Sequence, residues 1–257
     1  MNEKEIKEVI IPEKLAEIEK KENIKILHCV ESGSRAWGFQ SPDSDFDVRF
    51  IYVRPKEYYL RLDKTRDVIE WQLDETLDIN GWDLQKALRL LHKSNPTLFE
   101  WDNSPIVYKT TKEWKEISAI IGQYFKQKSG LYHYLSTTKS NYQEYLKDET
   151  VKLKKYFYVL RPILACKWIL EKKTPPPMLF STLVDVCLEK ELVPVVNELL
   201  RVKMQTSELG LGKRLDVLNE YIDKSIALIE ETLKNYPIGK LKTWEELNTI
   251  FLNNLDA

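Results

Sequence analysis

Two aspartates in a short hydrophobic run are the residues best suited to chemistry. Asp45 and Asp47 stand two apart, and strand alternation would put both carboxylates and Arg49 on one face, with Phe46 and Val48 on the other. Neighbouring carboxylates repel each other unless a cation lies between them. Oxygen ligands that leave positions free for phosphate and water suit Mg²⁺. The pair therefore predicts a magnesium site on a strand.

A turn suited to phosphate lies just upstream, with ten residues between Ser34 and Asp45. The apolar run 24–30 is typical of a buried strand, and Gly33 allows the tight turn that follows it. If a helix begins there, its unpaired N–H groups face the ligand. We expect Gly33 and Ser34 to hold the phosphates of a triphosphate and Arg35 to supply a positive counter-charge.

A calcium loop is the main alternative for Asp43, Asp45 and Asp47. That loop needs Gly at its sixth position and Glu at its twelfth, where this chain has Val48 and Arg54. Ser-Gly-Ser alone would also fit an ordinary turn. The phosphate signal and the metal signal together are more specific than either one.

The combined pattern resembles a known superfamily. Gly-Ser, a spacer of about ten residues and Asp-x-Asp inside a strand are similar to the DNA polymerase β nucleotidyltransferase superfamily, which includes poly(A) and CCA-adding polymerases and antibiotic nucleotidyltransferases. The longer run 33–49, with Gly-Trp-Asp-Leu at 81–84 and Lys-Ser-Asn-Pro at 93–96, resembles its RlaP/YcgL-like, RNA-repair-associated branch. A weaker likeness is found at 154–162.

The resemblance implies an α+β fold. A small mixed β-sheet of the polymerase β palm type would form a nucleotidyltransferase catalytic domain over residues 1–110, and an all-helical substrate-binding domain would follow over 111–257. It implies transfer of a nucleoside monophosphate from an NTP such as ATP to a hydroxyl, with release of pyrophosphate. Two Mg²⁺ ions, or Mn²⁺ in their place, would be held by Asp45, Asp47 and a third carboxylate. An inactive nucleotide- or partner-binding module of the same fold is the alternative.

The third carboxylate is expected on a strand beside the first two. Residues 67–80 alternate β-branched or aromatic residues with polar ones across a turn near Asp74, which indicates one or two strands. Polymerase-β-like sites carry this carboxylate between hydrophobic residues, and Asp78 has that setting. Glu70 and Asp74 remain open alternatives.

The rest of the chain reads as mostly helical. Residues 3–21 form a helical pattern split by Pro12, 55–60 a short helix or turn, and 84–91 a helix with Asp83 as its N-cap that stops near Asn95 and Pro96. Residues 104–108 are expected to be extended. Helices are then predicted over 111–127, 130–147, 151–173, 178–206, 213–235 and 243–255, with a kink or a new start at Pro162.

One helical face in the second half could bind nucleotide. Lys154, Tyr158 and Arg161 stand at i, i+4 and i+7, where two cations could grip phosphates and a ring could stack on a base. Residues 126–173 hold eleven Lys and Arg against four Asp and Glu. With the family likeness, this charge favours an RNA end as the acceptor, and a small molecule or a protein hydroxyl stays open as an alternative acceptor. The same residues could also form a helix face that is only solvated.

Composition limits the other classes of function. With 257 residues, 43% of them hydrophobic, the chain can bury a large core, and its net charge of −1 gives no general attraction to nucleic acids or membranes. The sequence shows no apolar run of about 18 residues and no signal-like N-terminus, so we expect no membrane association and a cytoplasmic location. Cys29, Cys166 and Cys187 are widely spaced and are expected to be reduced core residues.

Overall fold

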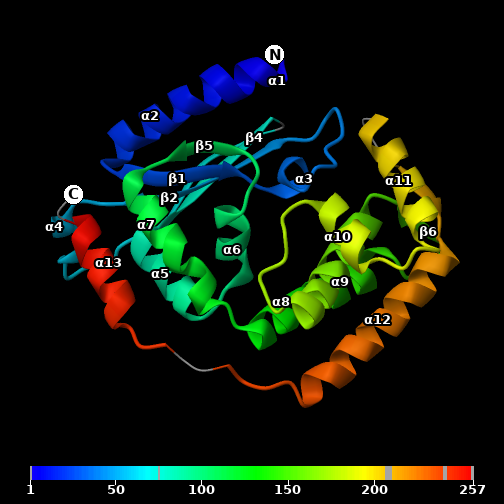
Figure 1. Cartoon of the computed structure of the whole chain (residues 1–257). Helices are drawn as coiled ribbons and strands as arrows, with labels where there is room; N and C mark the ends of the chain where they lie inside the picture. The colour runs from blue at the N-terminus through cyan, green and yellow to red at the C-terminus, as the bar shows by residue number, and fades with distance from the viewer. Residues whose placement is uncertain (1, 75, 206–209, 240–241, 256–257) are drawn as a thin grey trace.

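The computed structural model describes residues 2–74, 76–205, 210–239 and 242–255. Figure 1 shows a sheet with covering helices beside a group of helices. The five-stranded sheet has the order β3-β4-β2-β1-β5, and its strands are β1 (Lys25–Glu31), β2 (Phe46–Val53), β3 (Val68–Leu73), β4 (Leu77–Asp83) and β5 (Val107–Thr110). Strands β2 and β4 are parallel and the other neighbours are antiparallel. The predicted α+β fold with a mixed sheet is confirmed.

Helices cover both faces of this sheet. One face carries α2 (Ile11–Glu22), which continues α1 (Glu3–Glu5) through the π-helical turn η1 (Ile6–Ile10). The break predicted at Pro12 is therefore a change of helix type. The other face carries α5 (Leu84–His92), α6 (Pro96–Asp102), α7 (Lys112–Ile121) and α13 (Glu245–Leu255) (Figure 1).

Strand alternation decides which side chains reach which face. Phe46, Val48 and Phe50 are buried with the residues of α2. Asp47 and Arg49 therefore point to the opposite face, as the sequence predicted. Asp83 caps α5 by accepting a 2.7 Å hydrogen bond from the N–H of Gln85, which confirms its predicted role.

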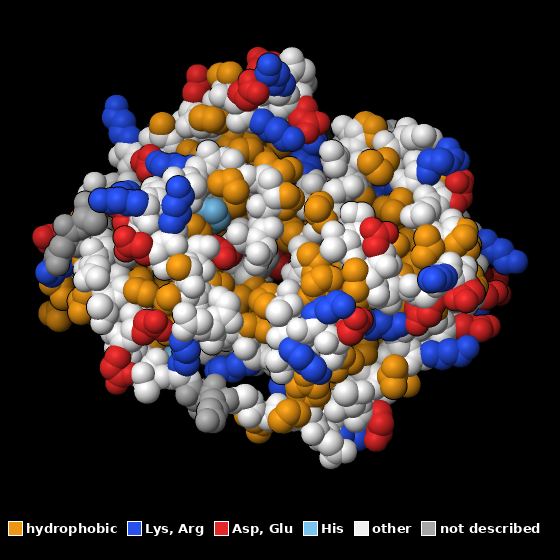
Figure 2. All heavy atoms as spheres, viewed as in Figure 1, with side chains coloured by type: hydrophobic (Ala, Val, Ile, Leu, Met, Phe, Trp, Pro, Cys, Tyr) orange, Lys and Arg blue, Asp and Glu red, His pale blue; other side chains and the backbone are white. Residues whose placement is uncertain are grey.

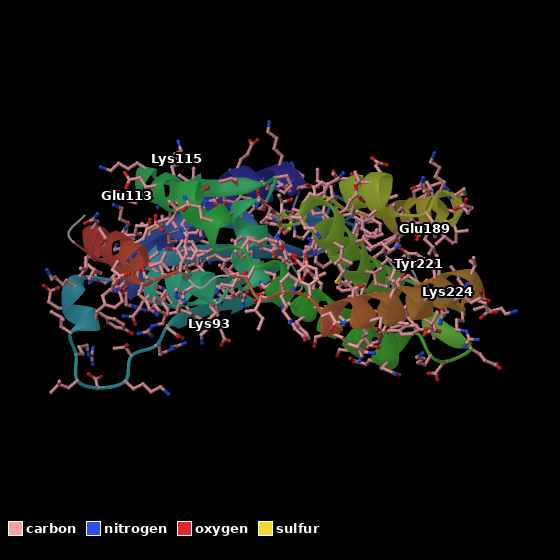
Figure 3. The ribbon with its side chains drawn as sticks, turned by 60° about the horizontal axis from the view of Figure 1, so that its bottom comes forward. Lys93, Glu113, Lys115, Glu189, Tyr221 and Lys224 are labelled. Carbon is pink, nitrogen blue, oxygen red and sulfur yellow. The ribbon has the colours of Figure 1, made fainter. Side chains whose placement is uncertain are left out.

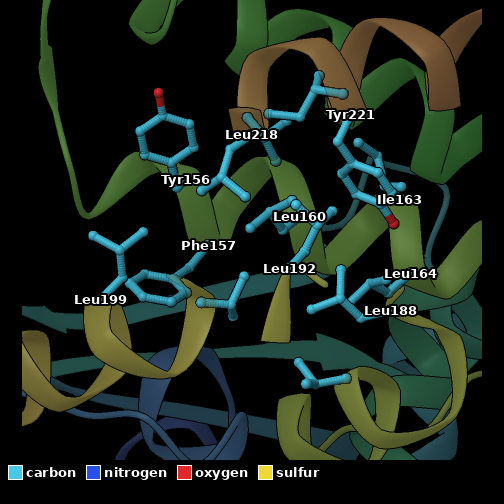
Figure 4. Close-up of a cluster of buried hydrophobic side chains, with 14 of the residues drawn as sticks. Tyr156, Phe157, Leu160, Ile163, Leu164, Leu188, Leu192, Leu199, Leu218 and Tyr221 are labelled. Atoms are coloured by element: carbon cyan, nitrogen blue, oxygen red, sulfur yellow. The ribbon is translucent and has the colours of Figure 1, made fainter. Parts of the chain in front are cut away.

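The second half is a helical unit around α9 (Lys155–Lys172). Helices α8 (Gln127–Tyr145), α10 (Phe180–Cys187), α11 (Val193–Gln205) and α12 (Asp216–Lys234) surround it. Its core includes Phe157 and Leu160 of α9 with Leu199 of α11 and Leu218 of α12 (Figure 4). Figure 3 shows Lys93, Glu113 and Lys115 on the sheet half and Glu189, Tyr221 and Lys224 on the helical half.

Several boundaries differ from the sequence prediction. The single helix predicted over 178–206 is replaced by α10 and α11, which are separated after Cys187, and α6 begins at Pro96, where Asn95 serves as the N-cap. Helix α9 runs on through Pro162 because Leu160 and Ile163 on either side are fully buried, and this packing outweighs the local cost of proline. A ribbon of β6 (Thr150–Lys152) and β7 (Leu211–Lys213) was not predicted. Three short elements, α3 (Gly33–Ala36), α4 (Lys56–Tyr59) and the 3₁₀ turn η2 (Gly122–Tyr124), complete the described chain.

The core of the sheet half includes residues from beyond position 110. Trp114 and Ile117 of α7 and Leu247 of α13 belong to the same buried cluster as Leu27 and Leu88. The last helix thus returns to the sheet, and the division at 110/111 remains a prediction. The three cysteines are buried and unpaired, as expected. Within the described ranges, every helix is too short or too polar to cross a bilayer.

Candidate active site

Two carboxylates face each other across the parallel strands β2 and β4. Asp47 and Asp78 are paired in register, and each side chain is 23% exposed. Nη2 of Arg49 lies between them, 2.9 Å from Asp47 Oδ1 and 2.5 Å from Asp78 Oδ2. The structure therefore brings Asp78 to the predicted pair.

The two alternatives for the third carboxylate lie elsewhere. Asp74 is exposed in the β3–β4 turn, where its side chain accepts hydrogen bonds of 2.8 Å from the N–H groups of Thr76 and Leu77. Glu70 is exposed on β3, which is separated from β2 by β4. Of the three candidates, Asp78 alone is paired with Asp47.

Asp47 carries the electrostatic signature of a crowded acidic site. The pKa of its carboxyl is raised to about 6, chiefly by burial and also by the charges of Asp45 and Asp78, while Arg49 and Arg35 oppose the shift. A cation beside these carboxylates would relieve the same repulsion.

Gly33 brings the turn against Asp47. It has a φ of +58°, and an added Cβ would lie 1.9 Å from Asp47 Oδ2. Only glycine fits here, because both the backbone conformation and the close approach exclude a side chain. Helix α3 (Gly33–Ala36) starts at this residue, so its first N–H groups have no partners within the helix. The turn and the carboxylate thus form one surface.

Arg35 is placed differently from the expectation. Its side chain is 6% exposed. It donates from Nε to the carbonyl of Asp45 (3.0 Å) and from Nη2 to the carbonyl of Ser44 (2.7 Å), and it stacks on Phe46. Glu3 of α1 lies 3.3 Å from Nη1. In this arrangement Arg35 holds the loop that presents Asp45, instead of extending toward a phosphate.

A cavity of about 140 Å³ lies where this loop meets the helical half. Ser34, Asp45, Lys154 and Tyr158 line it, and all four were predicted site residues. Tyr158 also lies edge-on to Trp37, with ring centroids 5.6 Å apart. The remaining lining residues are Ser41, Asp43, Ser44 and Lys203.

Lys203 is the least expected member of this cavity. It is only 5% exposed, and its Nζ donates a 2.8 Å hydrogen bond to the carbonyl of Phe39. Burial lowers the pKa of its ammonium group to about 8, against the opposing charge of Asp43. Lys203 therefore remains largely protonated at pH 7 and supplies positive charge at the wall of the cavity.

The loop between α3 and β2 is anchored in the helical half. Phe39 belongs to that half's core, with ring centroids 5.1 Å from Phe157 and 5.4 Å from Phe180. The N–H of Phe180 donates to the carbonyl of Trp37 at 2.9 Å. These contacts hold Asp45 against the end of α9.

Arg161 does not reach the cavity. Its guanidinium pairs with Glu100 at 2.9 Å and lies over the ring of Trp37. With a 5% exposed side chain, it joins α9 to α6 of the sheet half. Of the predicted helical face, the structure brings Lys154 and Tyr158 to the site.

Glu31 holds the backbone of Asp47 and was not predicted as a site residue. Its side chain is fully buried, and Oε1 accepts a 2.7 Å hydrogen bond from the N–H of Asp47. Tyr108 donates to its other oxygen, and burial raises the pKa of Glu31 to about 7. The Asp47 carbonyl accepts from the N–H of Ser32 (2.8 Å). The Glu31 carboxylate thus accepts the hydrogen bond from the backbone N–H of Asp47 at the point where β1 and β2 separate.

The donor set suits a hard divalent cation. Asp45 and Asp47 offer carboxylate oxygens beside a cavity with hydroxyl groups, and no soft ligand is among the residues named here. Across the described part of the chain, three or more His, Cys, Asp or Glu side chains nowhere gather as a preformed metal site. The position between Asp47 and Asp78 is taken by Arg49.

Other surfaces are less specific. A hollow of about 930 Å³ between α8 and α12, lined by Tyr132, Leu135 and Leu233 among others, contains none of the predicted site residues. On the face in Figure 2, acidic and basic side chains are interspersed. The polar cavity beside the carboxylates therefore remains the candidate active site.

Comparisons with known proteins identify the family of this chain. Residues 7–253 match the RlaP family, described as an RNA repair pathway DNA polymerase beta family. The chain is 46% identical over 255 residues, 98% of its length, to the protein YcgL of Bacillus subtilis (strain 168), described as uncharacterized, and covers 97% of it. A solved nucleotidyltransferase-like protein from Exiguobacterium sibiricum 255-15 aligns over 87% of this chain and 74% of its own, with 11% identity and a TM-score of 0.32. The chain belongs to the RlaP family of DNA polymerase β-type proteins.

Proposed function

We propose that the protein transfers a nucleoside monophosphate from an NTP, such as ATP, to a hydroxyl acceptor and releases pyrophosphate. The observation that carries this proposal is the pairing of Asp47 with Asp78 beside a polar cavity that holds Asp45, Ser34, Lys154 and Lys203. Asp45 lines the same cavity as Lys154 and Lys203, so acidic and basic groups meet in one small space, which supports a site for a metal-bound triphosphate.

In this reaction the acceptor oxygen attacks the α-phosphorus, and the bond from that phosphorus to pyrophosphate breaks. Asp45 and Asp47 would hold Mg²⁺, and Mn²⁺ could replace it; the resemblance implies two ions. A bound ion would neutralise the triphosphate and lower the pKa of the acceptor hydroxyl. Asp78 would orient that hydroxyl and accept its proton.

The cavity residues would bind the leaving group. The N–H groups of Gly33 and Ser34 and the Ser34 hydroxyl would donate to the terminal phosphates. Lys154 and Lys203 would supply positive charge as pyrophosphate forms. Tyr158, half-buried against Trp37, offers a ring on which a base can stack.

An RNA end is the acceptor that we favour. The family description names an RNA repair pathway. Close to the cavity, Lys155 lies 3.9 Å from the ring centroid of Tyr145 and 4.8 Å from that of Tyr158. Cations next to aromatic rings suit a single-stranded nucleic acid.

Incubation with each α-labelled NTP and Mg²⁺ or Mn²⁺ tests this proposal. Transfer RNA, short oligonucleotides, protein and metabolite mixtures should be offered as acceptors, and we expect label in the RNA. Label in protein or in a metabolite would show that the acceptor is not RNA but the labelled class of molecule. NTP binding without label in any fraction would favour the inactive binding module.

A further inference from the structure

Arg49 is fixed between the two paired carboxylates by four hydrogen bonds. Nη2 donates to Asp47 Oδ1 and Asp78 Oδ2, and Nη1 donates to the backbone carbonyls of Asp78 (2.7 Å) and Val48 (3.1 Å). The side chain is 14% exposed. It stands two residues after Asp47 on β2, so strand alternation directs it to the same face.

The guanidinium occupies the place of a bridging ion. One nitrogen contacts an oxygen of each carboxylate, so these are the oxygens that a divalent cation between Asp47 and Asp78 would need. An arginine side chain stays protonated at any working pH, and its planar fork fits two acceptors at once. A divalent cation at the same point would meet both the steric block and the repulsion of like charges.

One oxygen of Asp47 remains outside this arrangement. Oδ2 lies close to Gly33, at the turn where α3 begins. A Cβ added to Gly33 would be only 1.9 Å from this oxygen. Asp45 faces the same cavity. Asp47 Oδ2 and the Asp45 carboxylate therefore remain available as ligands for a cation near Gly33. The charges of Asp78 and of Asp47 Oδ1 are neutralised by Arg49.

We propose that Arg49 takes the place of one of the two divalent cations, so that the site uses a single ion held by Asp45 and Asp47. Arg49 is then a positioning residue, since it fixes Asp78 and Asp47 and supplies the second positive charge. The inference rests on the proposed function and changes its metal count from two to one.

Counting bound Mn²⁺ by electron paramagnetic resonance tests this count without turnover. The full chain is titrated with Mn²⁺ in the presence of an equimolar non-hydrolysable NTP, and free Mn²⁺ gives the number of ions bound per chain. We expect one ion for the wild type and two for Arg49→Met, which removes the charge but keeps much of the side-chain length. Arg49→Lys keeps a positive charge and should still bind one ion.

Arg54→Met is the matched control. Arg54 follows the same strand, its side chain is 9% exposed, and it pairs with Glu22 instead of the site carboxylates. This variant should bind one ion. Transfer by Arg49→Met should fall by about 100-fold, as for loss of a preorganised charged donor, and should recover in part at high Mn²⁺.

Each other result contradicts a specific part of the proposal. Two ions in the wild type would overturn it without any variant, and so would one ion in a folded Arg49→Met protein. If Arg49→Met does not fold, two ions bound to Arg49→Lys or to the wild type would also overturn the proposal. A wild type that binds no Mn²⁺ and transfers no label would reject the proposed function itself, and this inference with it.

Discussion

Asp47 and Asp78 are paired neighbours on parallel strands, and a single nitrogen of Arg49 donates to one carboxylate oxygen of each. Like charges that face each other on neighbouring strands destabilise a sheet, and Arg49 supplies the compensating charge here. The arrangement therefore points to a site, and it makes the choice of third carboxylate testable.

Asp78→Asn should reduce transfer by about 100-fold or more, because the acceptor hydroxyl loses its charged partner. Glu70→Gln and Asp74→Asn are matched controls on β3 and in the β3–β4 turn, and each should keep wild-type transfer within about twofold. Initial rates with saturating NTP measure all three. Loss of transfer in Glu70→Gln with a normal rate in Asp78→Asn would reverse the assignment.

Gly33→Ala should misplace Asp47 and lower transfer by about 100-fold, since an ångström-scale shift at a reacting centre has that effect. Gly38→Ala is the control, because Gly38 also has a positive φ (+81°) but its added Cβ would meet Leu179 at 3.2 Å. Both variants should lose about 1 kcal/mol of unfolding free energy from the left-handed backbone, and Gly33→Ala should lose more because its Cβ collides with Asp47. Equal transfer rates in the two variants would show that Gly33 is needed only for the backbone conformation of the turn and not for the position of Asp47.

Glu31→Ala should weaken Mn²⁺ binding and transfer about tenfold to hundredfold, because Asp47 loses the group that holds its N–H. Glu31→Gln keeps an acceptor at that point and should restore most of the loss. Ser104→Ala is the control, since Ser104 donates a 2.6 Å hydrogen bond to the Glu31 carbonyl without contacting Asp47. It should lower thermal stability only. A Glu31→Gln protein as weak as Glu31→Ala would exclude positioning through this hydrogen bond.

Lys203 predicts a pH dependence of NTP affinity. The empty site keeps the Lys203 proton below pH 8 and loses it above, because burial lowers the pKa to about 8. Affinity for a non-hydrolysable NTP should therefore fall up to about tenfold between pH 7 and pH 9, when roughly a tenth of the sites stay protonated. Lys203→Arg keeps its charge, so its affinity should stay level. The unfolded chain holds this proton up to its higher ordinary pKa, so the Lys203 contribution to the free energy of unfolding should rise between about pH 8 and pH 10.4. A wild-type affinity that stays flat to pH 9 would place Lys203 outside the phosphate site.

The sequence indicated the sheet half of the site well because its signals are local. Alternation in 45–50 assigned Asp47 and Arg49 to one face, and the apolar neighbours of Asp78 indicated a buried strand. The parallel pairing of β2 and β4 then placed Asp78 beside Asp47. The expectation of a third carboxylate on a neighbouring strand came from the family resemblance, and the pairing of the two strands is a long-range feature of the fold.

The helical half was harder because its contacts connect distant residues. Lys203 bonds to Phe39, 164 residues away, and no local pattern marks a lysine that will be buried. Arg161 shares a helical face with Lys154 by spacing, but its partner Glu100 comes from α6. The role of Arg35 was hard to predict for a related reason, since its acceptors are backbone carbonyls, and a pattern of side chains does not indicate which carbonyls a guanidinium will reach. The breaks in 178–206 and at β6 and β7 were likewise decided by packing.

The most direct test of nucleotidyl transfer compares the wild type with Asp45→Asn, Asp47→Asn and the double variant. Each purified protein is incubated with α-labelled NTP, Mg²⁺ and RNA, and both labelled RNA and released pyrophosphate are quantified. We predict one pyrophosphate per nucleotide transferred by the wild type, none without divalent cation, and less than a tenth of wild-type transfer for the double variant, with circular dichroism unchanged. A folded double variant that keeps more than a tenth of the activity would contradict the account.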